Sequence, residues 1–167
     1  MDHDTYMFHQ TPEELCKKLI NIVPLEPGDV VLEPFRGEGG FFNNFPDFVE
    51  KDWTEIEQGR DYTSHTAPFD WVISNPPFRL DSNGKRENAF FKLLKYYTER
   101  AIKGVAFLGN DYCLTTITPK RMREINESGW FIHSVTTCNV KKWRGRYYFV
   151  VWKKQPSNFF GFIDGTF

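Results

Sequence analysis

Apolar residues recur along the chain with two alternating periods, one typical of strands and one typical of helices. Short apolar or alternating runs predict six strands, at residues 30–35, 51–57, 69–74, 104–109, 130–140 and 146–154. Helical spacing of apolar residues predicts helices at residues 12–23, 41–45, 86–102 and 119–128. Strands that alternate with helices are typical of a parallel α/β sheet, and we expect the last two strands to form an antiparallel pair at one edge.

The first predicted helix carries a start signal, Thr11-Pro12-Glu13-Glu14. A threonine N-cap, a proline at the first helical position and glutamates in the first turn are typical of a helix N-terminus. We therefore expect the Thr11 side chain to cap this helix.

The length of 167 residues is that of one domain. We assign residues 1–154 to a single domain and residues 155–167 to a C-terminal tail. No apolar stretch reaches the ~18 residues of a membrane span, and the acidic N-terminus is unlike a signal peptide, so we expect an intracellular protein, in the cytoplasm or nucleus. Three scattered cysteines match neither a disulfide framework nor a zinc site, and no metal is expected.

The most informative segment is Asn75-Pro76-Pro77-Phe78, which directly follows the predicted strand at residues 69–74. Two prolines prevent further strand pairing and hold the backbone extended. The Asn75 side-chain oxygen and the Pro76 carbonyl can then act as two hydrogen-bond acceptors beside the flat Phe78 ring. This combination suits an exocyclic amine on a planar base.

A glycine-rich turn follows the predicted strand at residues 30–35, and its sequence is Arg36-Gly37-Glu38-Gly39-Gly40. Glycines let the backbone approach a ligand closely. In open α/β sheets, ligands bind outside the carboxyl ends of the strands. This turn and the Asn75 motif, which follow two strands of one predicted sheet, therefore predict a shared ligand site.

Charge is distributed unevenly, although the net charge is −1. Residues 1–78 carry 5 Lys/Arg against 15 Asp/Glu, and residues 79–167 carry 16 Lys/Arg against 7 Asp/Glu. An acidic half suits a cationic cofactor, and a basic half suits a polyanion such as nucleic acid. The boundary falls at the Asn75 motif, which favours this functional interpretation over ordinary solvated surface.

These motifs resemble those of the S-adenosylmethionine-dependent adenine-N6 methyltransferases, in the gamma order that places cofactor motifs before the Asn-Pro-Pro-aromatic motif. The resemblance covers residues 8–154. Small phage and viral DNA adenine methyltransferases are the most similar, with a Glu-Ile…Gly-x-Asp-aromatic run and a late Trp-x-Gly-Arg-Tyr-Tyr stretch. The resemblance implies a Rossmann-like class I sheet and S-adenosylmethionine as cofactor.

The resemblance also implies roles for individual residues. Thr11 would contact the methionine carboxylate and Glu33 the methionine amino group of the cofactor. Glu55 would hold the ribose hydroxyls, and Asp61 would accept from the adenine amino group. The candidate cofactor-binding residues are Thr11, Pro12, Glu33, Pro34, Phe35, Gly37, Gly39, Glu55, Ile56, Asp61 and Tyr62.

Two departures from the family pattern change these expectations. Only five residues separate Glu55 from Asp61, where the family usually places a helix and a strand. One strand has therefore been lost, leaving about six, and Glu57 is an alternative to Glu55 as the ribose acid. A chain of this length leaves no room for a separate target-recognition domain, so specificity is expected from short loops, a partner subunit or a homodimer.

The expected reaction needs no metal and no covalent nucleophile. Two acceptors that hold both N–H bonds of an adenine amino group would localise its lone pair toward a methyl donor, so that alignment supplies most of the catalysis. A target base in a duplex would have to be flipped out, and Phe78 would stack on it. The candidate catalytic residues are Asn75, Pro76, Pro77 and Phe78.

Basic residues near the expected pocket mouth are candidates for phosphate binding. They lie in the loop after the catalytic motif and before the last predicted strand: Arg79, Lys85, Arg86, Lys141, Lys142, Arg144 and Arg146. Ordinary solvation is the alternative for each of them. DNA is the favoured substrate, with RNA the nearest alternative. Further alternatives are cytosine-N4 transfer, a protein-glutamine methyltransferase, and an inactive methyltransferase fold that only binds nucleic acid.

Overall fold

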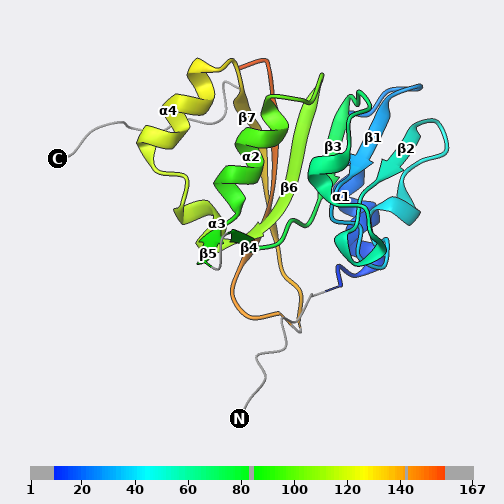
Figure 1. Cartoon of the computed structure of the whole chain (residues 1–167), viewed down its shortest axis with the longest axis horizontal. Coiled ribbons are helices and arrows are strands. Elements are labelled where there is room, and N and C mark those ends of the chain that lie inside the picture. The colour runs from blue at the N-terminus through cyan, green and yellow to red at the C-terminus, as the bar shows by residue number, and fades with distance from the viewer. Residues whose placement is uncertain (1–9, 83–84, 142, 157–167) are drawn as a thin grey trace, which may run out of the picture.

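The computed structural model describes residues 10–82, 85–141 and 143–156. Its centre is a six-stranded sheet in the order β2-β1-β3-β6-β8-β7 (Figure 1). The strands are β1 (Val30–Glu33), β2 (Glu50–Trp53), β3 (Trp71–Ser74), β6 (Gly104–Asn110), β7 (Phe131–Cys138) and β8 (Tyr147–Lys153). The first four of these in sheet order are parallel, and β8 is antiparallel to both of its neighbours, β6 and β7. This confirms the predicted α/β sheet, mostly parallel with an antiparallel pair at one edge.

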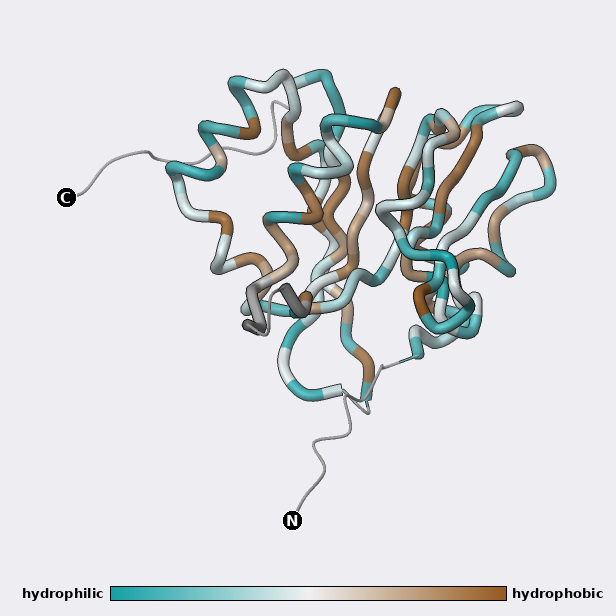
Figure 2. The backbone as a smooth tube through the Cα atoms, viewed as in Figure 1, coloured by the Kyte–Doolittle hydropathy of each residue, from teal (hydrophilic) through white to brown (hydrophobic). Residues whose placement is uncertain are grey.

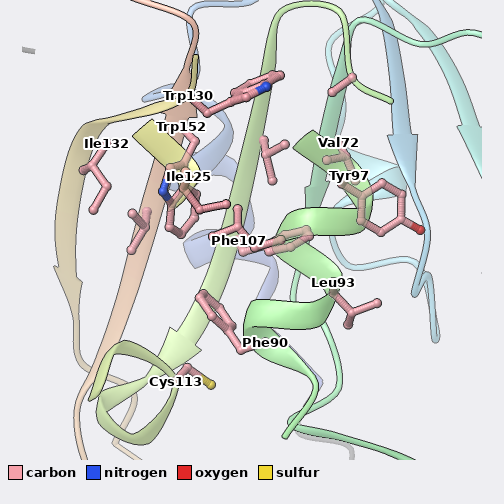
Figure 3. Close-up of a cluster of buried hydrophobic side chains, with 14 of the residues drawn as sticks. Val72, Phe90, Leu93, Tyr97, Phe107, Cys113, Ile125, Trp130, Ile132 and Trp152 are labelled. Atoms are coloured by element: carbon pink, nitrogen blue, oxygen red, sulfur yellow. The ribbon is translucent and has the colours of Figure 1, made fainter. Parts of the chain in front are cut away.

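Two apolar clusters cover the two faces of the sheet, because successive strand residues point to opposite sides. In β3, Val72 belongs to the cluster that also contains residues of α2 (Phe90–Thr98) and α4 (Pro119–Glu127). Its neighbours Trp71 and Ile73 pack with α1 (Glu13–Ile20) on the other face. Figure 3 shows the first cluster, in which helix and strand side chains interlock. In Figure 2 the central strands are largely brown, whereas many outer turns are teal.

The sheet ends at β2, as expected from the short spacing between Glu55 and Asp61. Two 3-10 helices, η2 (Ile56–Gln58) and η3 (Tyr62–Ser64), connect β2 to β3 in place of a helix and a further strand. The backbone N–H of Trp53 in this edge strand donates to Asp52 Oδ1 at 2.8 Å. This bond leaves one donor fewer for a foreign strand to pair with.

One predicted helix begins later than expected. Residues 79–82 and 85–88 form a two-stranded hairpin, β4 (Arg79–Ser82) and β5 (Lys85–Asn88), so the helix predicted over residues 86–102 is confined to α2. The backbone N–H of Ala89 donates to the Phe78 carbonyl at 3.0 Å and closes the base of the hairpin. The signal for it is the Asn83-Gly84 pair, which is typical of a two-residue hairpin turn and itself lies outside the described residues.

The carboxyl ends of β1, β3 and β6 meet at one edge of the sheet because these strands are parallel. In Figure 1 this is the lower edge, where α3 (Asp111–Thr115) and the β4–β5 hairpin lie. Across the part of the chain that the structure describes, no helix has both the length and the apolar character needed to cross a membrane. The tail predicted at residues 155–167 lies almost wholly outside the described residues.

Candidate active site

A small pocket lies at the carboxyl ends of β1 and β3. Its walls come from the segment before α1, the end of β1, the glycine turn and the end of β3. The lining residues are Gln10, Thr11, Glu33, Phe35, Arg36, Gly40, Phe41 and Asn75. The pocket therefore brings together residues from both of the motifs that the sequence singled out.

Glu33 is the buried acid of this pocket, with 2% of its surface exposed. Its Oε2 accepts a hydrogen bond from the Phe42 backbone N–H at 2.6 Å. Burial raises the pKa of the Glu33 carboxyl to about 8, and the Phe42 N–H and the Arg36 guanidinium oppose that rise. A carboxyl this deeply buried favours the approach of a cationic ligand group, which would stabilise its charged form.

The raised pKa of Glu33 predicts a pH-dependent loss of stability. Between about pH 4.5 and pH 8 the folded protein holds a proton on Glu33 that the unfolded chain has released, so stability falls as pH rises through this window. We expect Glu33→Gln to match the wild type in unfolding free energy at pH 5. At pH 8.5 we expect the variant to exceed it by about 4 kcal/mol, because each of the roughly three pH units between pH 5 and the raised pKa destabilises the wild type by about 1.4 kcal/mol.

Urea denaturation at pH 5, 6.5 and 8.5 measures this difference. Glu38→Gln is the matched control, because Glu38 is an exposed acid of the same turn. If the difference in unfolding free energy between wild type and variant stays constant with pH, the assignment of a raised pKa to Glu33 is wrong.

The glycine turn is held in a shape that only glycine adopts readily. Gly37 and Gly39 have φ angles of 52° and 90°. The Gly39 N–H donates to the Arg36 carbonyl at 2.8 Å, and the Gly37 N–H donates to Glu55 Oε2 at 2.7 Å. A Cβ on Gly39 would lie 2.8 Å from Asn43 Nδ2.

Glu55 faces this turn and is 7% exposed. Its second oxygen accepts from the Glu57 backbone N–H at 3.2 Å. Glu57 is an exposed residue, and Ile56 is 70% exposed. Of the two candidate acids, Glu55 is therefore the one that touches the glycine turn.

Two further candidates, Asp61 and Tyr62, lie in the segment that replaces the missing strand. Asp61 Oδ1 accepts from the Thr63 N–H at 2.8 Å and caps η3. The Tyr62 ring lies 5.4 Å from the ring of Phe35, at the end of β1. Phe35 and Tyr62 thus form an aromatic wall next to the pocket, because Phe35 is one of its lining residues.

Thr11 and Asn75 are 64 residues apart in sequence and form a hydrogen bond. Asn75 Nδ2 donates to Thr11 Oγ1 at 3.3 Å. The prediction that Thr11 caps the first helix is wrong: Pro12 occupies the N-cap position, and no side chain caps α1. Because Nδ2 points at Thr11, the Asn75 side-chain oxygen is left as the acceptor on the other side of the amide.

The four candidate prolines (Pro12, Pro34, Pro76 and Pro77) lie near the lining residues in sequence, but none of them lines the pocket itself. Pro34 and Pro76 are buried, and the Pro34 carbonyl accepts from Thr54 Oγ1 at 2.6 Å. The Pro12 carbonyl accepts from the Cys16 N–H at 3.0 Å and so starts α1.

Phe78 begins a row of aromatic rings that leads away from Asn75. Its ring lies 6.5 Å from that of Tyr147, and the Tyr147 ring lies 4.5 Å from that of Trp143. In the sequence, Tyr147 stands out only as part of the late Trp-x-Gly-Arg-Tyr-Tyr stretch, because nothing local shows that it packs near Phe78. Gln10 and Phe41 were also missed, and their only signal is that they adjoin predicted residues. Arg36 and Gly40 belong to the predicted glycine turn but were not among the candidate cofactor-binding residues.

The candidate phosphate-binding residues are described to different extents. Arg79 begins β4 and is exposed, and Lys141, Arg144 and Arg146 are exposed in the segment before β8. Lys85 and Arg86 lie in β5, where only the backbone is described, and Lys142 lies outside the described residues. Among the residues that the structure describes, no cluster of His, Cys, Asp and Glu could hold a metal ion.

Known proteins resemble this chain in fold and not in sequence. No protein-family model and no curated protein matches the sequence. Among solved structures, a Listeria monocytogenes protein assigned to the class I S-adenosylmethionine-dependent methyltransferases has a TM-score of 0.66 at 14% identity, over 87% of this chain and 61% of that one. A modification subunit assigned to a type I restriction enzyme of Vibrio vulnificus has a TM-score of 0.63 at 12% identity, over 88% and 45%.

A third match is the magnesium protoporphyrin IX methyltransferase of Synechocystis, solved with bound S-adenosylmethionine. Its TM-score is 0.60 at 9% identity, over 86% of this chain and 77% of that one. The chain spans 61% and 45% of the length of the first two of these proteins. At such identities the likeness establishes the fold alone: the chain has the Rossmann-like fold of class I methyltransferases.

Proposed function

We propose that this protein transfers a methyl group from S-adenosylmethionine to the N6 amino group of adenine in DNA. One observation carries the proposal: Glu33 and Asn75 line the same pocket, at the carboxyl ends of adjacent strands. The first is an acid suited to a cationic cofactor, and the second opens an Asn-Pro-Pro-Phe motif suited to an exocyclic amine. A methyltransferase needs these two partners side by side.

The residues present fit S-adenosylmethionine. The turn at residues 36–40 has the open glycine backbone that close approach to a ligand requires, and Glu33 is a buried carboxyl that gains from a neighbouring ammonium group. Thr11 and Glu33 would hold its methionine end, Glu55 the ribose, and Phe35, Asp61 and Tyr62 the adenine. The bound cofactor supplies a methyl group that is activated by its sulfonium, and the sulfur is left as a neutral thioether.

Asn75 and Pro76 would hold the amine that receives this methyl group. Asn75 Oδ1 and the Pro76 carbonyl accept its two N–H bonds and turn its lone pair out of conjugation with the ring. The bond from Asn75 Nδ2 to Thr11 supports this role, because it fixes which side of the amide is the acceptor. The proton lost from the product nitrogen passes to water.

Phe78 would stack on the target base, and the Tyr147 ring lies 6.5 Å from the Phe78 ring. A base in duplex DNA must leave the stack to reach this position. Each base that stacks on an aromatic ring gains about 1–3 kcal/mol. Arg79, Lys141, Arg144 and Arg146 would hold the phosphates around the pocket, with Lys85, Arg86 and Lys142 as further candidates.

Adenine in RNA is the alternative substrate, because the amine chemistry is the same. The basic loops, a partner subunit or a second copy of the chain would supply sequence selection. Transfer to cytosine N4 or to a glutamine side chain would use the same two acceptors. A glutamine side chain carries no phosphate, so the basic residues before β8 would have no role in binding it.

The test is transfer of labelled methyl groups from S-adenosylmethionine to matched single- and double-stranded DNA and RNA, with the product nucleoside identified by mass spectrometry. N6-methyl-deoxyadenosine in DNA is the expected product. Methyladenosine in RNA alone would replace DNA with RNA in the proposal. No transfer to any of the four polymers would overturn it.

A further inference from the structure

An exposed aromatic side chain lies at the same edge of the sheet as the candidate active site and has no role in the chemistry above. Tyr112 is 57% exposed. It lies in α3, which begins directly after the carboxyl end of β6, and β6 is the neighbour of β3, the strand that ends in Asn75. The tyrosine is therefore on the edge of the sheet where substrate would enter.

Tyr112 lies in a short helix that is anchored to the core through the neighbouring Cys113. Its neighbour Cys113 is 1% exposed and lies against Gly109, where an added Cβ would meet the Cys113 Cβ at 2.9 Å. The Cys113 N–H donates to Asn110 Oδ1 at 3.0 Å. Because Cys113 points into the core, the adjacent Tyr112 ring is kept at the surface.

Two hydrogen bonds join α3 to the basic segment before β8. The Asp111 N–H donates to the Arg146 carbonyl at 3.1 Å, and the Arg146 N–H donates to Asp111 Oδ1 at 3.1 Å. The next residue after Arg146 is Tyr147, whose ring packs near Phe78. The same short stretch thus connects the expected base-stacking ring, two exposed arginines (Arg144 and Arg146) and the Tyr112 helix.

We propose that Tyr112 stacks on a nucleotide next to the target base, while Arg144 and Arg146 hold its phosphates. This inference rests on the proposed function and adds a contact outside the pocket. Flipping a base breaks the stacking of its neighbours, and an exposed aromatic ring among cations replaces that stacking. The occupant is a nucleic acid strand because the rim offers both a flat apolar face and positive charge. The carboxylate of Asp111, which begins α3, accepts from the Arg146 backbone N–H.

Phe48 provides a matched comparison on the same molecule. It is 50% exposed, similar to Tyr112. It lies before β2, and its carbonyl accepts from Gly28, which precedes β1. That position is at the amino ends of the strands, on the opposite edge of the sheet. Exposed Asp47 and Glu50 flank it, which is the wrong charge for a polyanion.

The test is binding of a fluorescent oligothymidylate that carries one adenine, measured by anisotropy without cofactor. An abasic site replaces the nucleotide on the 5′ or the 3′ side of that adenine. We expect Tyr112→Ala to weaken binding about tenfold, Tyr112→Phe to retain it, and Phe48→Ala to leave it unchanged. We also expect an abasic site on one side to weaken wild-type binding about tenfold and to have no effect on Tyr112→Ala.

The inference would be overturned if Tyr112→Ala bound as tightly as wild type, or if the variant responded to both abasic sites as wild type does. A loss that Phe48→Ala shares would also overturn it. Because the assay measures binding alone, its result is independent of the methyl-transfer test. The predicted abasic-site pattern with no transfer would refute the proposed function and support Tyr112 as a nucleotide contact.

Discussion

Replacing Asn75 by alanine is expected to slow methyl transfer about 1,000-fold while S-adenosylmethionine binds with nearly unchanged affinity. The variant removes an oriented acceptor for the reacting amine, and removal of one preorganised hydrogen-bonding group costs about 10² to 10³ in rate. The side chain also fixes its own orientation through Thr11, so alanine loses the acceptor and its alignment together. The cofactor contacts proposed for Glu33 and the glycine turn do not involve Asn75.

Single-turnover transfer rates and calorimetric cofactor affinities separate these two effects. Asn21→Ala is the control, because Asn21 is an exposed asparagine at the end of α1. Thr11→Val removes the alignment of Asn75 and the contact proposed between Thr11 and the cofactor. At saturating cofactor we expect the lost alignment to slow transfer by a smaller factor of about ten, since the acceptor remains. Transfer by Asn75→Ala at the wild-type rate would rule out the proposed mechanism.

Replacing Gly39 by alanine is expected to weaken S-adenosylmethionine binding about 100-fold and to lower the unfolding free energy by about 2 kcal/mol. Gly39 has a φ of 90°, and its added Cβ would lie 2.8 Å from Asn43 Nδ2. Asn43 is tied to this turn by its own N–H, which donates to the Gly39 carbonyl at 2.9 Å. Alanine is strained at this φ, and the Asn43 side chain must also move aside to admit the methyl group.

Gly129→Ala separates backbone strain from damage to the site. Gly129 has a φ of 89°, an added Cβ there would meet no atom within 4 Å, and the residue follows α4. We expect this control to lose about 1 kcal/mol of stability and to bind the cofactor normally. Cofactor affinity measured by calorimetry and stability measured by urea denaturation give both numbers. Equal cofactor affinity in Gly39→Ala and wild type would exclude the glycine turn from the binding site.

Local sequence patterns were sufficient for much of the fold. The apolar runs that contain β1, β3 and β6 are buried strands, because a strand covered on both faces is apolar throughout. The short interval between Glu55 and Asp61 predicted the loss of a strand only through the resemblance, because the family usually places a helix and a strand there. The hairpin after Phe78 was missed, because the apolar spacing of α2 was extended back over residues that an Asn-Gly turn pairs as strands.

Other features depend on contacts between distant segments. Thr11 looks like a helix cap in its own segment, and only the approach of β3 gives it Asn75 as a partner. Tyr147 follows Phe78 by many residues, and only the antiparallel insertion of β8 beside β6 brings their rings together. No local pattern contains this information.

The sequence by itself determined the strand and helix periodicity, the glycine turn, the Asn-Pro-Pro-Phe motif and the division of charge, because each is a property of neighbouring residues. Only the tertiary structure decided the order of the strands, the burial that raises the pKa of Glu33, the bond between Thr11 and Asn75, and the exposure of Tyr112 beside the basic segment. These depend on how the layers pack, and packing joins residues that the chain keeps far apart.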